Sequence, residues 1–226
     1  MQGKVLRGPT NRTVALSLIV MTRPNRMMTS LFLLLCCLPL LLAAQDDVQT
    51  EVRTPWEYER YWQEYQNLDG RFQLLSPAAF KQRSDTLETN LGQQVQHTFH
   101  FETPDPATAE NVIYALSYVD YPAGSLHHDS TDLVTEFFAG TQEAATEALR
   151  GTLIYGSDKE VSGYPARQWR IDYKEGDATA RTLVAVVGNR YYEVKIFSLK
   201  AAGPNRSANR FFESVRFFAP PAAEAP

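Results

Sequence analysis

Hydrophobic positions along the chain recur with two different spacings, and these spacings predict its helices and strands. Spacing of three and four residues predicts helices within 55–67, over 125–151 and within 203–218. Alternation, or a short apolar run bounded by turn residues, predicts strands at 70–77, 93–103, 111–122, 151–161, 164–176, 179–189 and 190–200. Helices and strands are segregated along the chain, and the joins between strands are short. This order predicts an α+β fold, a sandwich in which helices cover a central antiparallel sheet.

The segment 125–151 has the clearest helical pattern. Asp129 or Ser130 is expected as its N-cap residue, and Asp132 in the first turn complements the helix dipole. Gly151 is expected just beyond the C-terminus, at the position that often takes a positive φ. The face expected to be buried consists of Leu133, Val134, Phe137, Phe138, Thr141, Ala144, Ala145, Ala148 and Leu149.

The four strands that follow this helix are expected to pair with their neighbours in sequence. Turn residues are expected to join them at 156–158 (Gly-Ser-Asp), 176–177 (Gly-Asp) and 188–189 (Gly-Asn). The last of these joins, within "VVGNRYYEV", is typical of a tight hairpin. In the strand 164–176, Trp169 and Ile171 are expected to pack against a helix.

A leucine-rich run near the N-terminus predicts a secretory signal peptide. Two arginines precede the run from Leu31 to Leu42, and Ala43-Ala44 follows it. Counted to Ala44, the run is shorter than the roughly 20 residues that a membrane-spanning helix needs. Cleavage is therefore expected after Ala44, and the mature protein is expected in the periplasm or outside the cell. Residues 1–20 lie upstream of the signal, so a later methionine could be the true start.

Removal of residues 1–44 changes both the cysteine content and the charge. Cys36 and Cys37 are the two cysteines of the chain, so the mature protein would have no disulfide, cysteine zinc site or thiol nucleophile. Leu35 before this pair departs from the small residues of a lipoprotein signal. The removed segment has five basic residues and no acidic residue, so the net charge falls from −4 to −9. Such a charge does not favour nucleic acid or an anionic membrane as a partner.

The mature chain is expected to form one domain with short extensions. Residues 45–69 are interpreted as a linker and a short amphipathic helix, 70–218 as the domain, and 219–226 as a disordered tail. Tyr58, Tyr61, Trp62 and Tyr65 would share one face of the short helix. That aromatic face could contact a partner protein, but apolar faces at helical spacing more often pack on their own domain.

The segment "SLHHDSTD" contains the residues best suited to hold a metal ion. Imidazole and carboxylate groups bind zinc and other divalent ions, and a site here would involve His127, His128, Asp129 and Asp132. A metal-dependent hydrolase is therefore one alternative function. The competing interpretation is that both aspartates serve the helix start and both histidines are ordinary loop residues. We favour that interpretation, and expect no cofactor.

Other catalytic signatures do not occur in the sequence. It has no G-x-S-x-G, H-E-x-x-H, P-loop or G-x-G-x-x-G motif. Arg167, Arg170, Arg181 and Lys195 could form a basic strip for an acidic ligand, although pairing with Asp172, Glu175 or Glu193 is the commoner arrangement on a sheet. Catalysis is accordingly not expected. A small-ligand carrier remains a further alternative, which depends on whether the fold encloses a pocket.

Four segments together resemble the PsbP-like family. "GRFQLLSPAAF" is similar to the opening of that family's domain, and "VSGYPARQWRIDY" resembles its glycine–x–proline–alanine strand entry. "ARTLVAVVGNRYYEVKI" resembles its paired strands, and "ANRFFESVRF" its closing helix. The resemblance covers roughly 70–218 and consists of landmarks of strands and helices, so no functional residue carries over from it.

The resemblance implies an α/β/α sandwich around an antiparallel sheet, and a role without catalysis. Members of the family include extrinsic subunits of photosystem II, a Ran-GTPase-binding protein and exported bacterial proteins. The signal peptide and the acidic charge do not fit a photosystem subunit, and export does not fit a nuclear partner. The expected function is a binding or assembly module of the bacterial cell envelope, with an unknown envelope protein or a small ligand as its partner.

Overall fold

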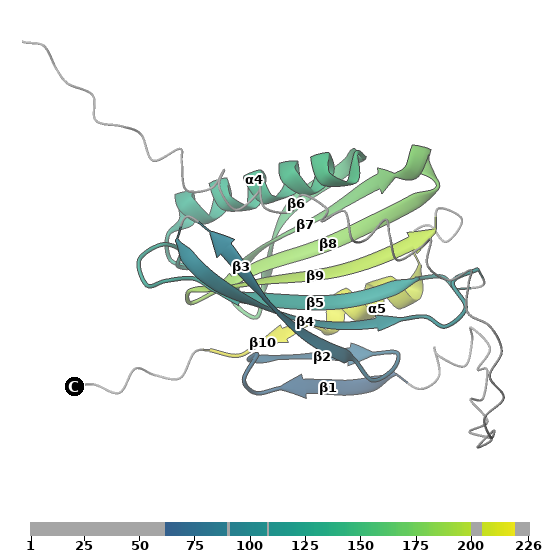
Figure 1. The fold of residues 1–226 in the computed structure, drawn as a ribbon, viewed down its shortest axis with the longest axis horizontal. Coiled ribbons are helices and arrows are strands. Elements are labelled where there is room, and N and C mark those ends of the chain that lie inside the picture. The colour runs from purple at the N-terminus through teal and green to yellow at the C-terminus, as the bar shows by residue number, and fades with distance from the viewer. Residues whose placement is uncertain (1–61, 90, 108, 200–204, 220–226) are drawn as a thin grey trace, which may run out of the picture.

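The computed structural model describes residues 62–89, 91–107, 109–199 and 205–219. These residues form two antiparallel sheets and two α-helices (Figure 1). They also form a short 3-10 helix, η2 (Lys174–Gly176). The helices are α4 (Thr131–Leu149) and α5 (Arg206–Ser214). The larger sheet has the order β3-β4-β5-β9-β8-β7-β6. Its strands are β3 (Lys81–Thr89), β4 (Gly92–Glu102), β5 (Ile113–Asp120), β6 (Thr152–Val161), β7 (Tyr164–Tyr173), β8 (Ala178–Val187) and β9 (Arg190–Leu199). The smaller sheet has the order β1-β2-β10, with β1 (Gln63–Asn67), β2 (Phe72–Ser76) and β10 (Arg216–Phe217).

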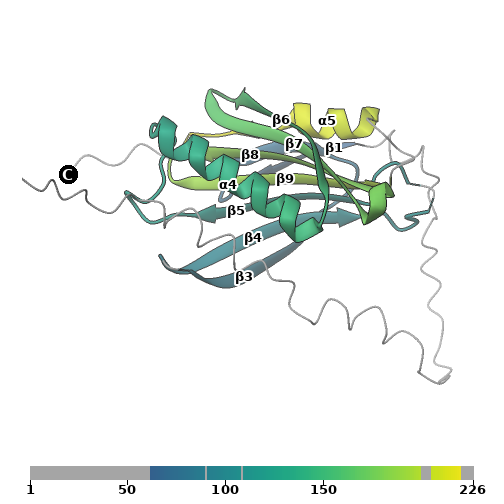
Figure 2. The same ribbon diagram turned by 90° about the horizontal axis from the view of Figure 1, so that it is seen from above.

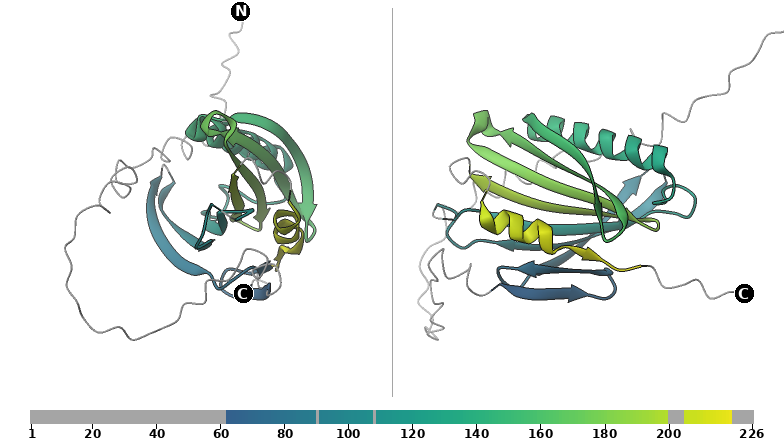
Figure 3. Two further views of the ribbon diagram at one scale, coloured as in Figure 1. Left: turned by 90° about the vertical axis from the view of Figure 1, so that its right-hand side faces the viewer. Right: turned by 180° about the vertical axis from the view of Figure 1, so that it is seen from behind.

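The two helices lie on opposite faces of the larger sheet. Successive residues of a strand point to opposite faces, and in β8 Leu183 packs with α5 and the smaller sheet, whereas Val184 packs with α4. Figure 2 shows α4 crossing the strands obliquely, and Figure 3 shows α5 and the smaller sheet together when the molecule is seen from behind. The expected α+β architecture with an antiparallel sheet is confirmed.

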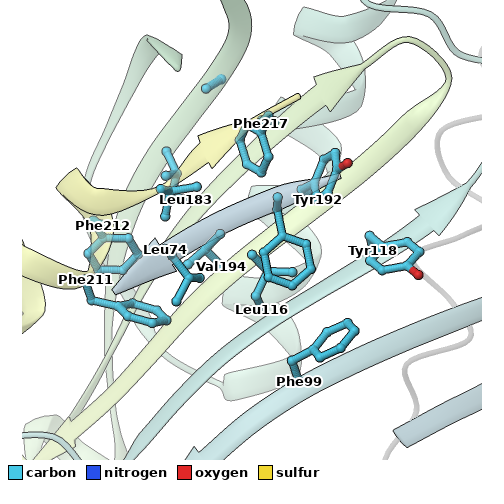
Figure 4. Packing of buried hydrophobic residues seen from close by; sticks show 14 of the residues in the cluster. Leu74, Phe99, Leu116, Tyr118, Leu183, Tyr192, Val194, Phe211, Phe212 and Phe217 are labelled. Carbon is cyan, nitrogen blue, oxygen red and sulfur yellow. The ribbon is translucent and has the colours of Figure 1, made fainter. Parts of the chain in front are cut away.

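The larger hydrophobic core lies between the larger sheet and the layer formed by α5 and the smaller sheet. Figure 4 shows side chains from both layers meeting there, and the ring centres of Phe217 from the smaller sheet and Tyr192 from β9 lie 4.3 Å apart. Phe72, Leu116, Tyr192 and Phe211 are completely buried. This burial makes the smaller sheet and α5 an integral part of the domain.

The second core lies between the larger sheet and the first half of α4. Val134, Phe137 and Phe138 of the helix pack onto Trp169 and Ile171 of β7 and onto neighbouring residues of β8. Both β7 side chains are completely buried, which confirms that this strand packs against a helix.

The two edge strands of the larger sheet are the least buried. Every residue of β6 except Val161 is exposed, and β3 is mostly exposed. The register of β6 against β7 shifts between Leu153 and Tyr155, so Ile154 forms a bulge. A bulge and charged side chains are both common devices that hinder edge-to-edge association of sheets.

The prediction of a short helix within 55–67 is wrong for residues 62–67, the part of this segment that the structure describes. Residues 63–67 form β1, which pairs antiparallel with β2 through a turn closed by Arg71 N–H donating to Leu68 O at 3.1 Å. Tyr65 packs on Phe72, Phe80 and Phe99, and Trp62 meets Tyr114 edge to face. These two aromatic residues therefore pack on the domain. Tyr58 and Tyr61 lie outside the described residues, as do the expected signal peptide, residues 45–61 of the expected linker and helix 45–69, and residues 220–226 of the expected tail 219–226.

Two further details of the strands differ from the expectation. Strand β3 was not expected, and it pairs with β4 along its whole length. The predicted turn at 156–158 is also wrong, because these residues lie inside β6. The chain reverses instead at Ser162 and Gly163, which both have positive φ, as a tight two-residue hairpin requires. The hairpin at 188–189 is confirmed by the pairing of Val187 with Arg190.

The ends of α4 lie where they were predicted, but the interactions that cap the helix differ from the expected ones. Ser130 is the N-cap residue, although its side chain makes no capping hydrogen bond. At the other end Arg150 takes the left-handed conformation expected of Gly151. Gly151 has a different reason to be glycine, because a Cβ there would collide with Ile171 and lie 2.7 Å from the carbonyl oxygen of Asp172.

Candidate ligand-binding cavity

The structure brings together three of the four residues predicted as metal ligands. One potential ligand atom each of His127, His128 and Asp129 lies within 4.8 Å of the others. Asp132 is not a member of this group and lies in the first turn of α4. His127 and Asp129 are exposed, and the two imidazole rings lie 4.4 Å apart.

The hydrogen bonds of His128 do not suit a metal ligand. Its Nδ1 accepts from the Gly188 backbone N–H at 3.0 Å, and its own backbone N–H donates to the Gly188 carbonyl at 3.0 Å. A neutral imidazole that accepts at Nδ1 carries its proton on Nε2, which here lies 3.3 Å from Asp129 Oδ1. That nitrogen then has no lone pair for a metal. The pair of bonds instead fastens the loop before α4 to the β8–β9 turn.

A serine–histidine pair on the edge of the sheet escaped the sequence analysis. Ser84 Oγ lies 2.9 Å from His97 Nδ1, and the His97 ring stacks on Tyr118 with ring centres 4.7 Å apart. Both carboxylate oxygens of the nearby Asp120 bind Arg190, at 2.6 and 2.7 Å. The carboxylate that would orient the histidine in a catalytic triad is therefore engaged elsewhere. The cross-strand register that creates this pair has no signature in the sequence.

The basic residues considered as a strip are paired with neighbours. Arg170 makes a two-point ion pair with Asp172, and Lys195 Nζ lies 2.8 Å from Glu193 Oε2. Arg167 binds Asp158 at 2.7 Å, a partner that the sequence analysis did not name. Arg181 Nη1 donates to Asn209 of α5. Asp172 and Glu193 are thus partners as expected, but each lies two residues from its basic residue along the same strand and not across from it.

A cavity of about 230 Å³ lies between the second half of α4 and the larger sheet. The helix forms one wall, β8 and β9 form the opposite wall, and β4 contributes Gln96. This cavity is smaller than the ~300–1,000 Å³ usual for drug-sized ligands, so it suits a small molecule. Its lining residues are Gln96, Thr141, Ala144, Ala145, Ala148, Leu149, Ala180, Thr182, Tyr191, Glu193, Lys195 and Phe197.

The cavity exists because side chains on the inner face of α4 change size along the helix. Phe137 and Phe138 fill the space beneath the first half. Ala144, Ala145 and Ala148 follow at helical spacing beneath the second half, and their methyl groups leave the space open. These alanines were expected to belong to the buried face of the helix, but Ala144 and Ala145 are only half-buried and Ala148 is exposed. The decrease in side-chain volume along the helix was the signal in the sequence that could have indicated a cavity.

The opposite wall follows from strand alternation and register. Tyr191, Glu193, Lys195 and Phe197 are every second residue of β9, so they share the face that α4 covers. Strand β8 pairs Thr182 with Lys195 and Ala180 with Phe197, which brings two small residues beside them. The apolar groups Ala180 and Phe197 thus lie next to polar groups on one continuous surface.

The polar residues of the lining are the ion pair Glu193–Lys195, Tyr191 with its buried hydroxyl, and Gln96, Thr141 and Thr182. The Glu193 side chain is 14% exposed and the Lys195 side chain 31% exposed, so their pair is shielded from water on one side. Burial raises the pKa of Tyr191 far above its usual range, and the negative charge of Glu193 raises it further. Tyr191 is therefore a hydrogen-bond donor at any physiological pH.

Comparison of the chain with protein-family models and with curated proteins finds no match. Among the residues that the structure describes, no helix has both the length and the apolar character needed to cross a membrane.

Proposed function

We propose that this protein is an exported, non-catalytic binding module that holds a small, mostly apolar ligand between α4 and the larger sheet. The observation that carries the proposal is the alanine-lined cavity with its few convergent polar groups. Pockets of this kind, apolar with a small number of polar groups, are the usual form of small-molecule sites. The small-ligand carrier is thus preferred to the metal-dependent hydrolase, whose histidine loop fastens a turn.

The resemblance to the PsbP-like family supports the same kind of role. Helices on both faces of an antiparallel sheet agree with the sandwich that the resemblance implies. Members of that family act by binding and assembly rather than by catalysis. Export to the periplasm or beyond follows from the leucine-rich N-terminal run. We assign the ligand-binding role to the cell envelope on these grounds.

An uncharged fluorophore, N-phenyl-1-naphthylamine, provides the test. Its fluorescence rises in an apolar environment, and we expect saturable binding to the mature protein at one site. Ala144→Phe fills the cavity and should abolish the signal, whereas Glu143→Phe adds the same ring to an exposed neighbouring position and should preserve it. Thermal unfolding should show that both variants are folded. Equal binding by the two variants would refute the proposed function.

A further inference from the structure

An ion pair lies on the middle strand of the larger sheet and lines the cavity. Strand β9 has three strands on either side of it, and its residues Glu193 and Lys195 share the face that α4 covers. Lys195 Nζ lies 2.8 Å from Glu193 Oε2. Taking two charges out of water is costly, and apolar residues in place of such a pair are often as stable or more so. Stability alone therefore does not explain why this position holds two charges.

The residues beside this ion pair are small, so its charged groups can be reached from the cavity. Lys195 lies between Ala115 of β5 and Thr182 of β8, and Glu193 lies directly across from Ser117 of β5. The Lys195 side chain is 31% exposed and the Glu193 side chain 14% exposed. An ammonium group has three N–H donors and a carboxylate has two acceptor oxygens, so their single contact leaves both groups with unused capacity.

The pairing restricts the charge of a ligand that contacts both groups. A lone anion beside Lys195 would also lie beside Glu193 and be repelled by it, and a lone cation beside Glu193 would be repelled by Lys195. An uncharged group would displace water from both charges without supplying an opposite charge to either of them. A head group with one positive and one negative charge gives each member of the pair a second, charge-assisted partner.

Apolar surface begins directly beside the ion pair. Phe197 is the next residue of β9 on this face, and Ala180 of β8 lies across from it. Ala144 and Leu149 of α4 line the same cavity from the opposite side. A ligand whose head group contacts the pair would therefore place its body against methyl, isobutyl and phenyl groups.

We infer that the cavity binds a small zwitterion with an apolar side chain, the class to which the apolar α-amino acids belong. Its carboxylate contacts Lys195, and its ammonium group contacts Glu193. Thr182, across from Lys195, and Gln96 of β4 add hydrogen-bonding groups to the same lining. This inference rests on the proposed function and names the class of ligand.

Four probes that share one phenyl ring separate the possible head groups: L-phenylalanine, phenethylamine, hydrocinnamate and hydrocinnamamide. At pH 7 phenylalanine carries both charges, phenethylamine only the positive one, hydrocinnamate only the negative one, and the amide neither. Each is titrated against the fluorophore bound to the mature protein. We expect phenylalanine to bind about ten-fold more tightly than the other three, because each of them lacks at least one charge-assisted contact. Equal or tighter binding of any other probe would overturn the inference.

Two variants that each remove one charge should invert this preference. In Lys195→Met the Glu193 carboxylate has lost its partner, so phenethylamine should become the tightest of the four probes. In Glu193→Gln the Lys195 ammonium group has lost its partner, so hydrocinnamate should become the tightest. Lys159→Met is the matched control, since it removes a positive charge from exposed β6 outside this cavity and should keep the preference of the parent protein.

A preference for phenylalanine that is unchanged in both cavity variants would contradict the inference. Thermal unfolding should show that the three variants are folded. The titration of the unmodified protein decides the ligand class even where a variant does not fold.

The failure of this inference and that of the proposed function give different results. Fluorophore binding that Ala144→Phe blocks, with no preference for phenylalanine among the four probes, would leave a ligand site and refute the ligand class. Fluorophore binding insensitive to Ala144→Phe would refute the site itself.

Discussion

Arg190 joins three segments of the chain with one guanidinium group. It binds both oxygens of Asp120 at the end of β5 and donates to the Asp69 carbonyl at 2.6 Å. The same group lies over the Tyr118 ring, 4.2 Å from its centre. Its side chain is only 10% exposed, so these contacts replace most of its hydration. Arg190 thereby holds the β1–β2 turn and the β5 end against the start of β9.

Asp120→Asn should destabilise the protein in a pH-dependent way. Burial raises the pKa of Asp120, but hydrogen bonding and charge from Arg190 outweigh burial and lower it overall. A lowered folded-state pKa gives stability that is present above the unfolded value of about 3.9 and is lost as pH falls through the folded value. We expect a loss of about 1–2 kcal/mol at pH 7, below that of a fully buried pair because the carboxylate is half exposed.

Urea denaturation at pH 7 and at pH 3 measures this effect, and the difference between the parent and Asp120→Asn should shrink at pH 3. Asp158→Asn is the matched control, since Asp158 also pairs with an arginine but its side chain is 71% exposed. Its effect should stay below about 0.5 kcal/mol at both values of pH. An equal loss at pH 7 and pH 3 for Asp120→Asn would contradict the role assigned to its charge.

At the scale of single residues, the sequence predicted which side chains are buried better than it predicted which side chains bind each other. Trp169 and Ile171 were expected inside and are completely buried. Asp120 showed no sign of its pairing with Arg190, 70 positions away, because that contact depends on the order of strands in the sheet. The burial of the Tyr191 hydroxyl likewise depends on how closely α4 approaches β9.

At the scale of elements, two glycines mark where α4 and its C-terminal turn approach the edge of the sheet. A Cβ on Gly151 would meet the Ile171 side chain and the backbone of Asp172, whereas one on Gly156 would meet only the end of the Gln142 side chain. Backbone and a buried strand residue cannot move aside, but the glutamine side chain can rotate. The two positions should therefore respond differently to the same substitution.

We expect Gly151→Ala to cost about 1–3 kcal/mol through overpacking. Gly156→Ala should change the free energy of unfolding by less than about 1 kcal/mol. The variant loses the 3.0 Å hydrogen bond from Arg167 Nε to Gln142 Oε1, but alanine also lowers the conformational entropy of the unfolded chain, which partly offsets the loss. Chemical denaturation of the two variants under one set of conditions measures both effects. A larger loss for Gly156→Ala than for Gly151→Ala would show that the helix and sheet are not packed as described.

The elements that were predicted wrongly are those that tertiary contacts determine. Residues 63–67 carry no strand alternation, yet they form β1 because Tyr65 packs under Phe72 and β2 offers an edge. Strand β3 is nearly all polar, since it lies exposed at the end of the sheet. Segments with a clear apolar pattern were predicted correctly: β4 and α4 show the periodicity of partly buried elements, and β5 and β8 are the short apolar runs expected of strands buried on both faces.

At the scale of the whole molecule, the sequence predicted the antiparallel sheet and its helices but not the smaller sheet or the cavity. Strand β10 has two residues, too few for any pattern, and it pairs with β2 far away in the chain. The cavity depends on a difference in volume between aromatic residues and alanines along one helix. Periodicity records which face is buried and does not record how completely the space is filled.

The central claim is that a small ligand occupies the space beneath the second half of α4. Alanine methyl groups report on it directly, because Ala144, Ala145, Ala148 and Ala180 line the cavity, while Ala166, Ala185 and Ala208 belong to the core on the other face of the sheet. NMR of methyl-labelled alanine during titration with N-phenyl-1-naphthylamine separates the two groups. We predict that the first four signals shift together and saturate while the other three stay in place. Saturating shifts confined to the other three, or no shift of the first four, would contradict the claim.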